Sequence, residues 1–204
     1  MARPFNPAIL LLAAGASRRM GAGRDKLMED VDGAPLLARS AQTALKTGAK
    51  VMVALPPDRS DRLAALPQGV HPVIVKDAHM GMGRSIAAGA QMAQGAGYDA
   101  LMILPADMPD ITAEDLSALL GQYETLPARS ILRATDQTGL AGHPVIFPPA
   151  DFAALSALQG DMGARAILQT AGARVLYHPL PGTHATTDLD TPQAWQDWRA
   201  SRGR

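Results

Sequence analysis

A stretch of small residues and cations near the start of the chain has the composition of a polyphosphate-binding loop. It reads Leu-Ala-Ala-Gly-Ala-Ser-Arg-Arg-Met-Gly over residues 12–21 and is followed by Lys26. Glycine and alanine let backbone N–H groups approach an anion closely. The side chains of Arg18, Arg19 and Lys26 add positive charge that the backbone alone cannot supply. The alternative interpretation is a solvated basic turn after a strand.

Three aspartates further along the chain are candidates for the acidic half of such a site. Asp107 follows a strand-like apolar run and lies between Pro105 and Pro109, which stiffen the loop and fix its direction. Asp188 and Asp190 precede the last predicted helix. The alternatives are that Asp107 is a turn residue and that the later pair only complements a helix N-terminus, where negative charge is favoured.

Two common glycine-rich nucleotide motifs do not fit the loop. In a P-loop the two glycines are separated by four residues and followed by Lys-Ser/Thr, whereas Gly15 and Gly21 are one residue further apart and Ala22 follows. A dinucleotide fingerprint requires Gly-x-Gly-x-x-Gly and an acidic residue closing the second strand. Here the run 51–55 ends in two prolines, so both motifs are excluded.

The loop instead resembles that of the molybdenum cofactor cytidylyltransferases, which belong to the MobA-like NTP transferases. Residues 12–21 match the family pattern Leu-Ala-Ala-Gly-x-Ser-x-Arg-Met-Gly position by position, although the spacing to Lys26 is one residue longer than usual. Residues 104–109 resemble the family's Leu-x-Asp-Met/Gln-Pro motif, and residues 187–192 resemble its Asp-Ile/Val-Asp-Thr-Pro segment. The resemblance extends from residue 8 to about residue 195.

This resemblance implies roles for individual residues. Arg19, Lys26 and Asp107 are the implied catalytic residues, and Asp107 with Asp188, or in second place Asp190, would hold Mg²⁺ or Mn²⁺. The nucleotide-binding residues implied by the family are Leu12, Ala13, Ala14, Gly15, Ser17, Arg19, Lys26, Ser85 and Asp107.

Two later segments resemble the far side of the cleft in the cytidylyltransferase branch, where the second substrate lies. They contain Gly142, His143, Asp161 and Arg165, which are the implied acceptor-binding residues. By composition alone, His143 is equally a structural histidine, and Asp161 with Arg165 equally an ordinary i,i+4 ion pair.

The reaction implied is transfer of CMP from CTP to the terminal phosphate of molybdopterin, with release of pyrophosphate. Guanylyl-transferring relatives usually carry glycine where this chain has Ala14, which favours CTP over GTP. The alternatives are GMP transfer, CMP transfer to another phosphorylated acceptor, or a non-catalytic carrier of the molybdenum cofactor. A molybdenum hydroxylase is the implied client.

Bulk composition excludes several other classes. The 204 residues suit one domain spanning 1–204. With 19 basic and 19 acidic side chains the net charge is zero, so neither nucleic acid nor a membrane is an expected partner. No cysteine is present, which suits a cytoplasmic protein. The first apolar run, 8–12, resembles a secretory signal but is short and flanked by prolines, so a buried strand is preferred.

The elements that must position these residues alternate between strand and helix. Strands are predicted at 8–12, 50–55, 70–75, 100–104 and 174–177, and helices at 35–48, 58–66, 85–94, 112–123, 150–158, 164–170 and from 192. Such alternation predicts an α/β fold: a three-layer, Rossmann-like, doubly wound and mainly parallel sheet. Residues 130–134 and 144–147 are predicted to form an antiparallel hairpin lying over the site.

Overall fold

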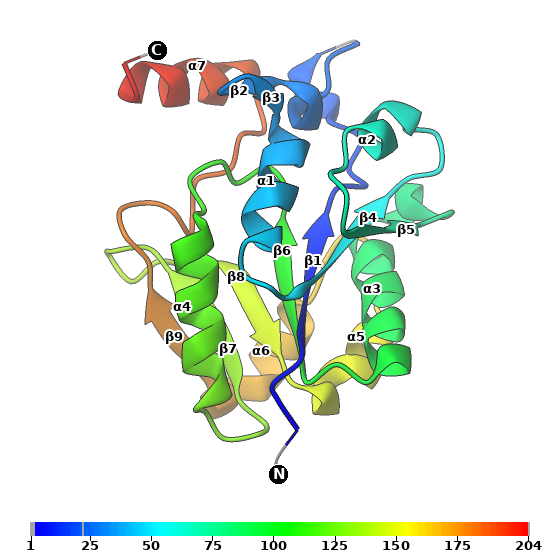
Figure 1. Ribbon diagram of the computed structural model, residues 1–204, viewed down its shortest axis with the longest axis vertical. Helices are drawn as coiled ribbons and strands as arrows, with labels where there is room; N and C mark the ends of the chain where they lie inside the picture. Colours follow the sequence, from blue (N-terminus) through cyan, green and yellow to red (C-terminus); the bar gives the residue numbers. More distant parts are fainter. Residues whose placement is uncertain (1–2, 22, 204) are drawn as a thin grey trace.

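The computed structural model describes residues 3–21 and 23–203, which form a seven-stranded sheet covered by helices on both faces (Figure 1). In sheet order the strands are β5 (Val70–Ile74), β4 (Lys50–Leu55), β1 (Pro7–Leu12), β6 (Ala100–Pro105), β8 (Ala141–Phe147), β7 (Ile131–Thr135) and β9 (Val175–Pro179). Only β8 is antiparallel to its neighbours among these strands. The predicted mainly parallel α/β fold is confirmed.

The central strands are buried on both faces, and successive residues enter different cores. Ile9 and Leu11 of β1 pack with helices α1 and α4, whereas Ala8 and Leu10 pack with α3, α5 and α6. This two-sided burial explains why the strands read as continuous apolar runs. The helices are α1 (Leu36–Leu45), α2 (Ser60–Ala64), α3 (Met82–Ala96), α4 (Ala113–Glu124), α5 (Phe152–Ser156), α6 (Arg165–Ala171) and α7 (Pro192–Ser201).

A third, smaller apolar cluster joins the two ends of the chain above the carboxyl edge of the sheet. The hairpin of β2 (Asp30–Val31) and β3 (Ala34–Pro35) lies beside α7 at the top of Figure 1. Trp195, only 1% exposed, packs there with Trp198. Within the described residues, no helix is both long and apolar enough to span a bilayer.

Most predicted elements are confirmed with boundaries shifted by a few residues, but one placement was wrong. The antiparallel hairpin exists, yet its strands do not lie over the site. Strand β8 is inserted into the sheet between β6 and β7, where Val145 pairs with Ile103 on one side and Arg133 on the other. Residues 144–147 are buried. A segment that is buried on both sides needs neighbouring strands as hydrogen-bond partners for its backbone N–H and C=O groups.

Two glycines of α3 provide a matched test of how closely this helix packs on the sheet. A Cβ at Gly89 would lie 2.3 Å from Cδ2 of the buried Leu10, whereas a Cβ at Gly95 would meet nothing within 4 Å. We expect Gly89→Ala to lower the free energy of unfolding by about 1–3 kcal/mol through overpacking. Gly95→Ala should raise it by about 0.5–1 kcal/mol by increasing helix propensity. Urea denaturation measures both, and equal shifts would contradict the packing described.

Burial of the His143 imidazole on β8 makes stability depend on pH. Its Nδ1 is buried without a hydrogen-bond partner among the described residues. Burial, reinforced by the nearby Arg133 guanidinium, lowers the pKa of His143 to about 4.

Between pH 6.5 and about 4 the unfolded chain therefore binds a proton at His143 that the folded chain does not. We expect the free energy of unfolding to fall as the pH decreases through this window, with about 3 kcal/mol contributed by this group. Denaturant titrations at pH 7, 5.5 and 4.5 should show a shallower decline for His143→Gln. Identical pH dependence in the two proteins would contradict this assignment.

Candidate active site

Three loops at the carboxyl edge of the sheet surround a cleft of about 410 Å³. They follow β1, β5 and β6, the loops predicted to share one rim. This volume is typical of small-molecule sites, which span roughly 300–1,000 Å³. The predicted site residues lining the cleft are Leu12, Ala14, Gly15, Ser17, Arg19, Lys26, Ser85, Asp107, Asp161 and Asp190. Those outside the lining are Ala13, Gly142, His143, Arg165 and Asp188.

The cationic loop, which follows β1 and carries Arg18, Arg19 and Lys26, meets the acidic residues at Lys26. Its ammonium group donates hydrogen bonds to carboxylate oxygens of both Asp107 and Asp190. The guanidinium of Arg19 lies 2.5 Å from the other Asp190 oxygen. All three side chains of the Lys26 cluster are less than one-fifth exposed, at 14% for Lys26, 12% for Asp107 and 18% for Asp190. The structure therefore places positive and negative candidates in direct contact.

Ionisation in this cluster follows from burial and neighbouring charge. Burial alone would lower the pKa of Lys26, but the two carboxylates hold that pKa above its ordinary value. Burial would likewise raise the pKa of Asp190, yet hydrogen bonding and charge from Lys26 keep it low. The pKa of Asp188 is raised by burial and by the charges of Asp190 and Asp107. Asp190, rather than Asp188, is thus the acid that faces the cations.

The donor set also fits a hard divalent cation. Oδ1 of Asp107 is buried and has no hydrogen-bond partner among the described residues, while its Oδ2 accepts from Lys26. In the described part of the chain, no group of three or more histidine, cysteine, aspartate or glutamate side chains is arranged so that it could hold a metal ion. Mg²⁺ commonly uses one or two carboxylates and completes its shell with water and substrate phosphates. Asp107 and Asp190 fit that pattern.

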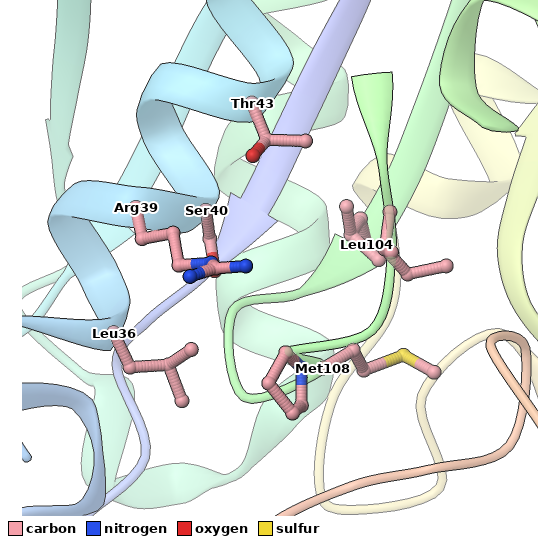
Figure 2. A pocket seen from close by; sticks show the side chains of 8 residues that line it. Leu36, Arg39, Ser40, Thr43, Leu104 and Met108 are labelled. Carbon is pink, nitrogen blue, oxygen red and sulfur yellow. The ribbon is translucent and has the colours of Figure 1, made fainter. Parts of the chain in front are cut away.

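Helix α1 braces the loop that carries Asp107. The Ser40 hydroxyl donates to the carbonyl of Ala106 at 3.0 Å, and Figure 2 shows Ser40 and Arg39 on α1 facing Leu104 and Met108. The hollow between them measures only about 10 Å³, close to the minimum for one water molecule. It is a packing gap beneath the loop rather than a ligand site.

The C-terminal segment holds the same loop from the opposite side. The N–H of Leu189 donates to the Asp107 carbonyl at 3.1 Å, which fixes Asp190 beside Asp107. Nearly two turns into α7, the Trp198 indole donates to Asp110 at 2.9 Å. These contacts tie a segment 82 to 88 positions further along the chain to the loop after β6.

Sequence reasoning missed Arg62, which is fully buried behind the cationic loop. Its guanidinium contacts the carbonyls of Ala13 and Gly15, the hydroxyl of Ser17 and the carboxylate of Asp25. Arg62 lies on a five-residue helix in a polar stretch, where an arginine is normally expected to be exposed. No local pattern in the sequence marks it.

The residues predicted to bind the acceptor lie in three different places. Asp161 lines the cleft, close enough to Gly81 that a Cβ there would lie 2.4 Å from its Oδ1. Gly142 and His143 instead pack on the segment leading to Asp190: the His143 N–H donates to Ala185 O at 2.8 Å. Arg165 is exposed at the start of α6 and forms no ion pair with Asp161. The acceptor-binding roles of these residues stay predictions.

Comparison with known proteins finds similar proteins and structures over nearly the whole chain. Purine catabolism protein PucB of Bacillus subtilis is 28% identical over 91% of this chain and 92% of its own. A probable molybdenum cofactor guanylyltransferase of Synechococcus elongatus is 29% identical over 94% and 97% of the two chains. A crystal structure of Rv0371C from Mycobacterium tuberculosis in complex with manganese superimposes with a TM-score of 0.78, at 22% identity over 96% of this chain and 99% of that one.

The family assignment rests on the part of the chain that builds the cleft. Residues 9–175 match the model of the MobA-like NTP transferase domain. They include the cationic loop, Asp107 and all of the sheet except the first two residues of β1 and most of β9. The chain therefore belongs to the MobA-like NTP transferase family of nucleotidyltransferases.

Proposed function

We propose that this protein transfers CMP from CTP to the terminal phosphate of a molybdopterin-type acceptor, with a divalent metal ion. One observation carries the proposal: Lys26 contacts both Asp107 and Asp190 at a cleft that residues 14–16 line. Backbone donors, cations and a carboxylate pair in one place are the parts that phosphoryl-type transfer needs, since positioning and charge neutralisation carry its catalysis.

In this reaction an acceptor phosphate oxygen forms a bond to the α-phosphorus of the nucleotide. The bond between that phosphorus and the bridging oxygen to the β-phosphate breaks, and the bridging oxygen leaves with pyrophosphate and the bonding electron pair. Lys26 and Arg19 neutralise charge that develops on the transferring and leaving phosphates. Asp107 and Asp190 would hold the Mg²⁺ or Mn²⁺ ion, which acts as a Lewis acid on phosphate oxygens when bound. No covalent enzyme intermediate is required.

Two observations bear on which nucleotide is used, and they point in different directions. Guanylyl-transferring enzymes of the family usually carry glycine at the position of Ala14, so the alanine of this chain supports CTP. The relative from Synechococcus elongatus, by contrast, is named a probable molybdenum cofactor guanylyltransferase, which supports GTP as the competing donor. Ser85 and Met82, in the first turn of α3, line the cleft, and the family resemblance implies that Ser85 contacts the nucleotide base.

A non-catalytic carrier of the molybdenum cofactor is the alternative from another class. Such a protein would keep the cleft and deliver its cargo to a client enzyme such as a molybdenum hydroxylase. The contact of Lys26 with two acids favours catalysis, because a carrier needs cations for phosphate but has no use for a carboxylate pair beside them.

We expect Asp107→Asn to reduce metal-dependent pyrophosphate release by at least about 100-fold, because it removes one of the two charges that hold the metal. Asp58→Asn, an exposed aspartate outside the cleft, is the matched control and should retain parental activity. The assay follows pyrophosphate release from CTP with molybdenum-loaded cofactor, with and without Mg²⁺. A parent protein that binds the cofactor but releases no pyrophosphate with any donor would favour the carrier.

Donor choice is tested with CTP, GTP and ATP separately in the same assay. We expect kcat/KM for CTP to exceed that for GTP by about 10-fold or more, a difference of roughly 1.4 kcal/mol in transition-state binding. Ala14→Gly should shift the ratio toward GTP. A parent that prefers GTP would overturn the cytidylyl assignment while leaving nucleotidyl transfer intact. Methylerythritol phosphate in place of the cofactor tests the alternative acceptor.

A further inference from the structure

We infer that Arg62 is a positioning residue that aims the backbone donors of the cationic loop and Lys26 at the nucleotide's phosphates. The inference rests on the proposed function. Arg62 does not line the cleft; it lies behind the loop, fully buried, and reaches it from α2.

Every N–H of the Arg62 guanidinium has a partner in the loop. Nη1 donates to Ala13 O at 2.5 Å and to Gly15 O at 2.8 Å. Nη2 donates to Ser17 Oγ at 3.2 Å and to Asp25 Oδ1 at 2.7 Å, and Nε donates to Asp25 Oδ2 at 2.7 Å. Since a guanidinium has five donors in a fixed plane, this set uses all of them.

The two carbonyl contacts determine which way the loop presents its N–H groups. In a trans peptide unit the C=O of one residue and the N–H of the next point in opposite directions. Drawing the carbonyls of Ala13 and Gly15 toward Arg62 therefore turns the N–H groups of Ala14 and Ala16 away from it. Both alanines line the cleft, so these donors face the side where a polyphosphate would lie.

The carboxylate contacts position Lys26. Asp25 accepts two hydrogen bonds from Arg62, one from Arg59 and one from the N–H of Leu27. It is the N-cap residue of the short 3-10 helix η2 (Lys26–Met28). Lys26 is the next residue, so the direction of its side chain toward Asp107 depends on where Asp25 is held. The hydroxyl of Ser17 also donates to Asp25 at 2.8 Å, with Ser17 in the left-handed region at φ 50°.

Lysine cannot substitute for Arg62 in this role. An ammonium has three donors radiating from a point, whereas the guanidinium matches a carboxylate with two parallel bonds and still has donors for two carbonyls. Lysine would retain the charge that, together with that of Arg59, balances the buried carboxylate of Asp25, but it would lose part of the loop contacts. Arg62→Lys therefore separates the positioning of the loop from the charge balance of the core.

The test measures binding of inorganic tripolyphosphate, supplied with Mg²⁺, by calorimetry in the full chain, beside thermal unfolding of each variant. We expect the Kd to rise about 10-fold or more for Arg62→Gln and by a smaller factor for Arg62→Lys. Hydrogen exchange over residues 13–19 should increase in both. Leu119→Ala, a substitution of a fully buried residue of α4 that does not line the cleft, is the stability control. It should unfold at a lower temperature yet bind tripolyphosphate as the parent does.

The outcomes separate this inference from the proposed function. If the folded Arg62 variants bind tripolyphosphate as tightly as the parent, Arg62 is only a structural ion pair and the inference is wrong. If Leu119→Ala loses affinity to the same extent as Arg62→Lys, general destabilisation explains the loss and the inference is also wrong. A parent that does not bind tripolyphosphate would overturn the proposed phosphate site itself. Should Arg62→Gln fail to fold, the charge-retaining Arg62→Lys decides the question.

Discussion

The contact of Lys26 with Asp107 and Asp190 is the interaction on which the architecture of the cleft depends. The three side chains come from segments separated by 81 and 164 positions in the chain, and each is mostly buried. A charge removed from water without a partner is strongly destabilising, so the three segments must arrive together. The loops after β1 and β6 and the segment before α7 are therefore coupled by electrostatics as well as by packing.

The sheet supplies the rigidity that this coupling requires. Strands β1 and β6 are adjacent and parallel, so their following loops begin at the same edge, and the Ala106 N–H donates to Leu12 O at 3.1 Å. The Leu189 N–H to Asp107 carbonyl contact then adds the third segment. Because buried strands on both sides fix these starting points, the short loops need only a few hydrogen bonds to hold their functional groups.

The parts of this arrangement that were predictable from sequence are those encoded locally. The apolar run 8–12 followed by small residues and cations marks both β1 and its loop, and the prolines around Asp107 mark a stiff turn at a strand end. Strand β8 was misplaced because an antiparallel strand inserted into a parallel sheet has the same apolar pattern as a hairpin lying outside it. The β2–β3 hairpin was not predicted because each of its strands has only two residues, although its Asp-Gly turn is a recognisable hairpin signal.

Arg62 illustrates a part that sequence cannot supply. Its neighbours are polar, its helix is short, and its partners lie 37 to 49 positions away, so nothing in the local pattern indicates burial. What makes burial possible is that the loop offers an anion, a hydroxyl and two carbonyls in the plane of one guanidinium. That match exists only after the chain has folded.

The charges that line the cleft also bear on how a triphosphate would enter it. Among the described residues of the lining there are three cations, Arg18, Arg19 and Lys26, and three acids, Asp107, Asp161 and Asp190. The cleft is thus formally neutral, and a bare triphosphate, which carries several negative charges, would meet the acids as well as the cations. A divalent cation arriving with the phosphates would offset the acids and release Lys26 to contact the anion. The internal pairing of Lys26 is therefore consistent with a site that accepts metal and nucleotide together rather than either one alone.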